Sequence, residues 1–171
     1  MKYTKFNKNK NYNLNIIFVF EDSLSSVNKM IGKSLVADDI KYSIQNNVVN
    51  GKVNSHNMFS SKLYDDNYFL VGLGNKKELT IQKYEKCLMS ALKQINTYKM
   101  PNISIDLSNI KIKNFNTLKG TIIEIEKTKY SYRKNDEYTL RECAFKFGTT
   151  SDTKLLHKVI KESVAIASGI N

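Results

Sequence analysis

Cysteine, histidine, proline and tryptophan are scarce or absent, with two, two, one and none among 171 residues. Cys87 and Cys143 lie far apart in apolar segments, so we expect reduced core thiols instead of a disulfide framework. The longest apolar run, Ile16 to Phe20, is far shorter than the ~20 residues of a membrane-spanning helix. No signal-peptide core follows the lysine-rich start. We therefore expect a soluble, cytoplasmic protein with no membrane partner.

The scarcity of histidine also limits the chemistry that this chain can perform. His56 and His157 form no H-E-x-x-H pair and lie near no cysteine, so a zinc site of His and Cys ligands is not supported. Adjacent acids such as Asp38 and Asp39 are usually just solvated. No G-x-S-x-G turn presents a serine nucleophile, and two distant histidines assemble no triad. We expect no catalytic residue and no metal ligand in this chain.

Arginine is scarce in spite of a net charge of +11, because only Arg133 and Arg141 are arginines among 27 basic residues. A basic surface attracts phosphate at long range. Recognition of bases and phosphates, however, favours the planar fork of arginine over lysine. Lys, Asn and Ile are abundant together, as in Asn7 to Asn15. We interpret the charge mainly as a solvated surface, with DNA kept as an alternative partner.

The sequence contains an alternation of strand and helix patterns after a polar lead-in, residues 1–13. Short apolar or alternating runs predict strands at residues 14–20, 57–62, 68–73, 102–107 and 141–147. Helical spacing predicts helices at residues 23–35, from the N-cap Thr80 to residue 95, and from Ser151 or Asp152 to the end. The apolar spacing in residues 115–130 is compatible with either a helix or a strand, and we favour the helix.

This alternation predicts the fold class. Strands that alternate with helices are typical of an α/β domain with a mostly parallel or mixed sheet and helices on both faces. The strand at 102–107 alternates apolar and polar residues, so we expect one of its faces to be open. The length suits a single domain, residues 14–171.

One turn is a candidate binding site. Gly72-Leu73-Gly74 follows a strand and precedes a helix, which is the context of a dinucleotide-binding turn, but Lys77 stands where the third glycine of that fingerprint belongs. A tight exit from the strand explains the two glycines better. The adjacent helix start can still hold an anion. The candidate anion or phosphate contact therefore comprises Gly72, Gly74, Lys76 and Lys77.

Three passages carry a resemblance to a known family. Residues 67–94, NYFLVGLGNKKELTIQKYEKCLMSALKQ, hold a strand that ends in V-G-L-G, a basic loop, E-L-T and a long helix. Residues 16–26, IIFVFEDSLSS, hold a first strand and an acidic turn, and residues 167–171, ASGIN, close the last helix. Together these passages resemble the amino-terminal domain of the leucyl (cytosol) aminopeptidase family.

The resemblance implies a macro-domain-like α/β fold in a non-catalytic domain that precedes a catalytic domain absent from this sequence. The full-length parent would be a hexameric metallopeptidase that releases amino-terminal residues of peptides with two divalent metals, zinc or manganese. The amino-terminal domain would support assembly and active-site access, and some bacterial relatives also use it to bind DNA. The alternative is a stand-alone macro-like module that binds nucleotide or nucleic acid through its basic surface.

Overall fold

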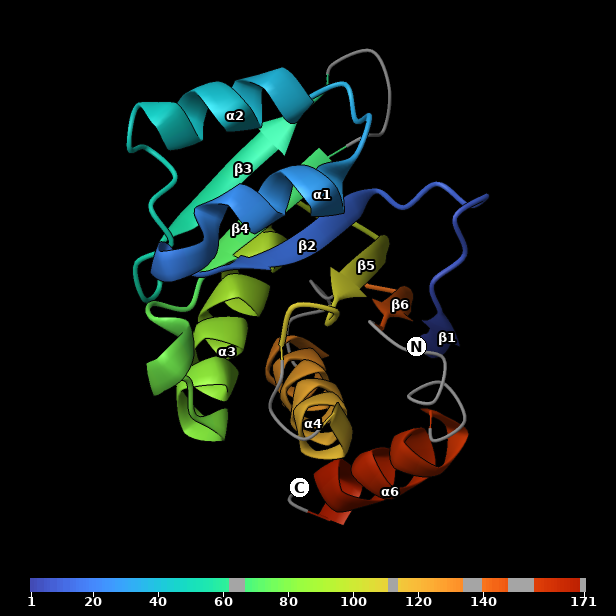
Figure 1. The fold of residues 1–171 in the computed structure, drawn as a ribbon. Helices are drawn as coiled ribbons and strands as arrows, with labels where there is room; N and C mark the ends of the chain where they lie inside the picture. Colours follow the sequence, from blue (N-terminus) through green and yellow to red (C-terminus); the bar gives the residue numbers. More distant parts are fainter. Residues whose placement is uncertain (62–66, 111–113, 134–139, 148–155, 170–171) are drawn as a thin grey trace.

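A six-stranded sheet forms the middle layer of the molecule, in the order β1-β6-β5-β2-β4-β3 (Figure 1). The computed structural model describes residues 1–61, 67–110, 114–133, 140–147 and 156–169. Its strands are β1 (Lys2–Lys5), β2 (Leu14–Val19), β3 (His56–Ser60), β4 (Asn67–Gly72), β5 (Asn102–Asp106) and β6 (Glu142–Lys146). β3 runs antiparallel to β4, and the other described pairs are parallel. The prediction of a mixed sheet is confirmed.

Helices cover both faces of the sheet, as predicted. One face, which we call the α2 face, carries the 3-10 helix η1 (Glu21–Ser26), α1 (Val27–Ile31) and α2 (Ala37–Gln45). The other, the α3 face, carries α3 (Ile81–Thr97), α4 (Asn114–Arg133) and α6 (Leu156–Gly169). A short 3-10 helix, η2 (Lys76–Glu78), precedes α3. The helix favoured at residues 115–130 is confirmed by α4, whereas Ser151, Asp152 and residues 170–171 lie outside the described residues.

The apolar run of β2 serves two cores, because successive side chains of a strand point to opposite faces. Ile16 and Phe18 pack among the residues of the α3 face. Ile17 and Val19 pack beneath α1 and α2. All four are almost fully buried. The run is therefore continuous and does not alternate, as expected for a central strand covered on both faces.

The start of α3 and the two cysteines agree with the sequence. Thr80 caps α3, where its hydroxyl oxygen accepts a hydrogen bond from the Lys83 N–H at 3.2 Å. Cys87 and Cys143 are free and buried, as predicted for core thiols. Burial raises the pKa of both thiols, so they remain protonated and act as small apolar residues.

The prediction of one helix over residues 23–35 is wrong. The segment forms η1 and the short helix α1, and Ser23 has a non-helical backbone. Gly32 has φ +59°, a conformation that residues with a side chain rarely adopt, and α1 ends at the residue before it. Leu35, which the helical spacing placed on the apolar face, is 61% exposed. Helical spacing alone did not reveal the stop at Gly32.

Two further features differ from the sequence-based expectation. The lead-in, residues 1–13, contains a strand, β1, which pairs in parallel with β6, and Tyr12 is buried. β5 has no open face, because Ser104 and Asp106 are as buried as the apolar residues beside them. In the part of the chain that the structure describes, no helix is both long and apolar enough to cross a membrane.

Candidate functional site

The turn after β4 lies at the carboxyl edge of the sheet, beside the end of β2. Gly72 is in register with Val19, and the Leu73 N–H donates to the Val19 carbonyl at 2.9 Å. The Glu21 N–H donates to the Gly74 carbonyl at 3.0 Å. The two parallel strands therefore end together, and their loops are held against one another by backbone hydrogen bonds.

The loop at residues 51–55 fills the space in front of this turn. The Gly72 N–H donates to the Ser55 carbonyl at 2.8 Å, and the Gly74 N–H donates to the Gly51 carbonyl at 2.8 Å. A methyl group on Gly72 would overlap the Lys52 carbonyl oxygen and the Ser55 hydroxyl. Both glycine N–H groups thus bond to the chain itself. The interpretation of the glycines as a tight strand exit accounts for both positions.

The two predicted lysines occupy different surroundings. The Lys76 ammonium donates to Oδ1 of Asn109 at 3.1 Å and lies 5.2 Å from the centre of the Phe20 ring. The Lys76 N–H donates to Oδ1 of Asp22 at 3.2 Å. Lys76 therefore joins the loops that follow β2, β4 and β5. Lys77 is exposed, and its N–H donates to Oδ1 of Asn75 at 3.2 Å.

Asn109 and Asp22 were not among the residues predicted from sequence. Both follow the end of a parallel strand by three residues, and that position was the available signal. The anion contact at Lys76 and Lys77 stays a prediction. His56 lies on β3 and His157 on α6, in different layers of the fold.

A small polar groove opens on the α2 face, where neither α1 nor α2 covers the sheet. Its volume is about 50 Å³, and its floor is formed by Asn15, Ser104, Asp106 and Lys146. The Lys146 ammonium lies 2.8 Å from Oδ2 of Asp106. No local sequence pattern indicates this groove, because Lys146 and Asp106 meet only through the pairing of β5 with β6.

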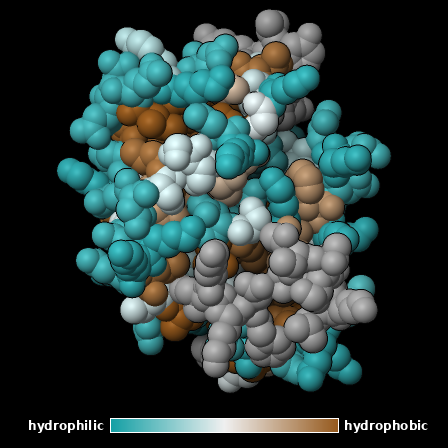
Figure 2. Space-filling model, viewed as in Figure 1, coloured by the Kyte–Doolittle hydropathy of each residue, from teal (hydrophilic) through white to brown (hydrophobic). Residues whose placement is uncertain are grey.

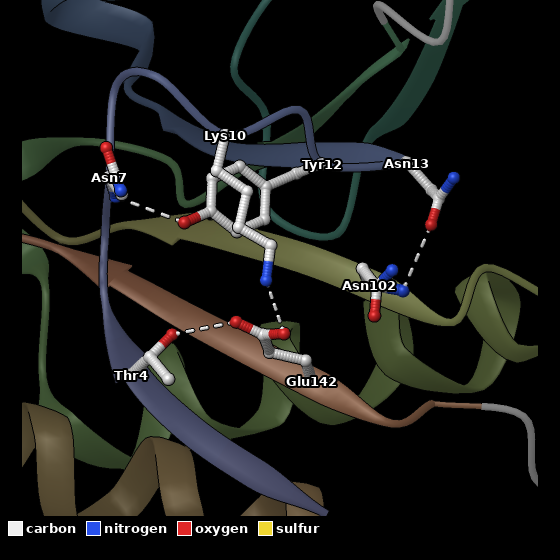
Figure 3. A network of polar contacts seen from close by, with 7 residues as sticks. All are labelled: Thr4, Asn7, Lys10, Tyr12, Asn13, Asn102 and Glu142. Carbon is white, nitrogen blue, oxygen red and sulfur yellow. Dashed lines mark hydrogen bonds and ion pairs between the residues drawn. The ribbon is translucent and has the colours of Figure 1, made fainter.

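The loop between β1 and β2, residues 6–13, lies over β6 on the same face (Figure 3). The Lys10 ammonium lies 2.5 Å from Oε2 of Glu142, and the Thr4 hydroxyl donates to Oε1 at 3.1 Å. The Tyr12 hydroxyl accepts a hydrogen bond from the Asn7 N–H at 3.1 Å. One carboxylate on β6 thus holds both the strand β1 and the loop that follows it.

We expect the substitution Lys10→Met to raise the pKa of Glu142 toward its ordinary value. The hydrogen bond from Lys10 is the largest cause that lowers this pKa, and the one from Thr4 adds to it. Because the pKa is lower in the folded chain, the pair stabilises the fold above the unfolded-state pKa of about 4.3. That stabilisation is lost as the pH falls through the lowered folded-state value.

The measurement is a carbon-detected NMR titration of Glu142 in the wild-type chain and the variant. The stability loss at neutral pH should stay below about 1 kcal/mol, since Lys10 is partly exposed. The matched control is Lys41→Met, which breaks an exposed pair with Asp38. An unchanged Glu142 pKa in Lys10→Met would show that the ion pair does not form in solution.

A match to a sequence profile identifies the family of this chain. The profile of the cytosol aminopeptidase family, N-terminal domain, matches residues 16–136, well over half of the chain. The chain belongs to the cytosol aminopeptidase family. The match includes most of β2, the turn Gly72-Leu73-Gly74 and α3, which lie in two of the passages that carried the resemblance in the sequence. Comparison with curated proteins by sequence gives no match.

Solved structures agree with this family assignment at the level of the fold. A mutant of tomato leucine aminopeptidase superposes with a TM-score of 0.71 at 13% identity, over 99% of this chain and 36% of that one. The bottromycin maturation enzyme BotP gives 0.62 at 11% identity, over 92% and 30%. A mutant macrodomain from Oceanobacillus iheyensis gives 0.62 at 14% identity, over 91% and 87%. The macro-domain-like fold is therefore confirmed.

This chain of the cytosol aminopeptidase family spans about a third of the length of the two enzymes, 36% and 30%. Among its described residues, no group of three or more His, Cys, Asp or Glu is placed to hold a metal ion. The residues that the structure describes do not fit a metal centre. The family is one of peptidases, and the matched part is its N-terminal domain.

Proposed function

We propose that this chain is the non-catalytic amino-terminal domain of a cytoplasmic leucyl aminopeptidase. The parent releases amino-terminal residues from peptides, and its two divalent metals, zinc or manganese, are bound by a catalytic domain outside this sequence. The profile match over residues 16–136 carries the proposal. It is supported by the superposition on tomato leucine aminopeptidase and on BotP, whose structure has also been solved in complex with Mn.

The domain supports assembly of the parent into a hexamer and access to its active site. Much of the surface in Figure 2 is hydrophilic, with smaller hydrophobic areas between the charged side chains. Tyr42 on α2 is 68% exposed, and Val48 in the following loop is 58% exposed. The Val48 N–H donates to the carbonyl of Ser43, the residue after Tyr42, at 2.9 Å, so the two residues are near neighbours. Clusters of exposed apolar side chains are typical of contact surfaces. We assign Tyr42 and Val48 to the contacts that assembly uses.

The test compares the 171-residue chain with the full-length parent. We expect the full-length protein, loaded with zinc or manganese, to hydrolyse a leucyl amide, and the 171-residue chain to show no hydrolysis. Metal-dependent hydrolysis by the purified chain alone would overturn the proposal. In the full-length protein, Tyr42→Ser should shift the mass measured by light scattering toward smaller species. The matched control is Lys41→Ser, at an exposed position on the same helix, which should leave the mass unchanged.

The family match does not favour the alternative of a stand-alone module that binds nucleotide or nucleic acid. A titration of the chain with duplex DNA at low and moderate salt distinguishes the aminopeptidase domain from the stand-alone binding module. Binding through a basic surface weakens steeply as salt rises, because released counterions drive it. Salt-dependent binding by the chain without its parent would support the alternative.

A further inference from the structure

The polar groove on the α2 face lies between two coverings of the sheet. α1 and α2 cover β2, β4 and β3, and the loop between β1 and β2 places Lys10 beside Glu142 of β6, so β5 is left between these two coverings (Figures 1 and 3). The groove of about 50 Å³ opens there, with Met30 of α1 and Phe6 of the lead-in among its lining residues. The groove lies over the central strands, where a sheet covered by helices normally carries apolar side chains.

Strand pairing brings the polar floor together. Asn15 is in register with Ser104, and Asp106 is in register with Lys146. Residues directly opposite on neighbouring strands have side chains close enough to interact. The Ser104 hydroxyl donates to Oδ1 of Asn15 at 2.6 Å. Four polar side chains from three strands therefore share one small surface.

The floor presents a negative and a positive group side by side. Asp106 is only 5% exposed, and its carboxylate accepts hydrogen bonds from the Ser108 N–H at 2.9 Å and from the Ser108 hydroxyl. The Lys146 side chain is 37% exposed, and its ammonium lies 5.9 Å from the centre of the Phe6 ring. A buried carboxylate costs free energy unless it is well paired. Here the partner of Asp106 is Lys146, the more exposed of the two side chains.

Hydrogen-bonding capacity remains on both charges. An ammonium has three donors, and the hydrogen bonds found among the described residues use one of those of Lys146, toward Asp106. An ionised carboxylate has about four acceptor positions, of which Asp106 uses three. The Ser104 hydroxyl donates its one proton to Asn15, and the lone pairs of its oxygen remain available as acceptors. The groove thus offers acceptors for an ammonium and donors for a carboxylate within one small space.

We propose that this groove binds the head group of a free α-amino acid. The ligand ammonium bonds to Asp106 and the Ser104 oxygen, its carboxylate bonds to Lys146, and its side chain lies along Phe6 and Met30. A water needs about 10–15 Å³ of such volume, so the groove holds about three to five heavy atoms, enough for a head group and little more. A zwitterion satisfies both charges, whereas a simple anion would meet the Asp106 carboxylate and a simple cation would compete with Lys146.

This inference goes beyond the proposed function, because it concerns a ligand of this domain and not a substrate of the parent. The first test is an NMR titration of the isotope-labelled 171-residue chain with L-leucine, N-acetyl-L-leucine and L-leucinamide. The acetyl group removes the ammonium charge, and the amide removes the carboxylate. All three share the same side chain, so the comparison isolates the head group.

We expect L-leucine to shift the backbone amides of Ser104, Asp106 and Lys146 in a saturable manner, at millimolar concentration because the buried part is small. Each capped compound should bind about tenfold more weakly or worse, since each loses a charge-assisted hydrogen bond. Three results would overturn the proposal: no saturable shift with L-leucine, equal shifts with the capped compounds, or shifts confined to another surface.

The second test uses variants of the floor. Lys146→Met and Asp106→Asn should each weaken L-leucine binding about tenfold. The control Lys86→Met removes an exposed lysine of α3, on the other face of the sheet, and should leave binding unchanged. If circular dichroism shows that Asp106→Asn does not fold, Lys146→Met and the three-compound series still test whether the groove binds the amino-acid head group. Unchanged binding in Lys146→Met would contradict the proposal.

Discussion

Phe18→Ala should lower the free energy of unfolding by about 3–5 kcal/mol, the cost of removing a fully buried ring from a core that cannot close around the gap. Phe18 is 0% exposed on the central strand β2. Its ring lies edge-on to that of Tyr84, with centroids 5.1 Å apart. The Tyr84 hydroxyl is in turn 2.7 Å from Oγ1 of Thr121 on α4. The cavity would therefore open where β2, α3 and α4 meet.

Urea denaturation followed by circular dichroism measures this loss. The control is Tyr98→Ala at the rim of the same core, where the ring is 37% exposed and lies 6.3 Å from that of Phe69. Less area is removed from the core there, so we expect a loss below about 1.5 kcal/mol. If the two variants lost equal stability, Phe18 would not occupy the centre of the core as described.

Gly72→Ala should cost about 3 kcal/mol, at the upper end of what one added methyl group costs in a packed site. The new methyl group would overlap the Lys52 carbonyl oxygen and the Ser55 hydroxyl. The loop cannot simply retreat, because the Gly72 N–H bonds to the Ser55 carbonyl and the Asn54 N–H bonds to the Gly72 carbonyl. Relief of the overlap would break both backbone hydrogen bonds.

The matched substitution is Gly169→Ala at the end of α6, where an added methyl group would meet no atom within 4 Å. Alanine favours helix over glycine by about 1 kcal/mol, so this variant should be neutral or slightly more stable. Thermal denaturation of both variants gives the comparison. Wild-type stability in Gly72→Ala would mean that the loop at residues 51–55 does not pack on the turn, and the interpretation as a tight strand exit would fail.

The Gly72 prediction also bears on function, because the same turn was the candidate anion site. A glycine turn that cradles a phosphate keeps its N–H groups open toward the ligand. Here those of Gly72 and Gly74 donate to the loop at residues 51–55, while Lys76 bonds to Asn109. The family's V-G-L-G passage thus serves the packing of strand ends in this chain. Spare hydrogen-bonding capacity is also found on the α2 face, at Asp106 and Lys146.

The sequence by itself determined the elements whose signals are local. The apolar run of β2, the turn at Gly72 and the helix that begins after Thr80 each depend on residues that are close in the chain. Hydrophobic periodicity and capping act over one or two turns or a few strand residues, so a short window contains the whole signal. The passage at residues 67–94 also indicated the family, which the profile match confirms.

Only the tertiary structure decided the features that depend on distant partners. β1 is a polar tetrapeptide that becomes a strand because β6, about 140 residues later, offers a free edge with which its N–H and C=O groups pair. Ser104 and Asp106 looked like an open face and are buried, because neighbouring strands supply their partners, Asn15 and Lys146, at the floor of a narrow groove. Asp106 meets Lys146 across β5 and β6, a pairing that no local pattern encodes. Long-range strand pairing sets which polar groups become neighbours, and therefore where this domain can bind a ligand.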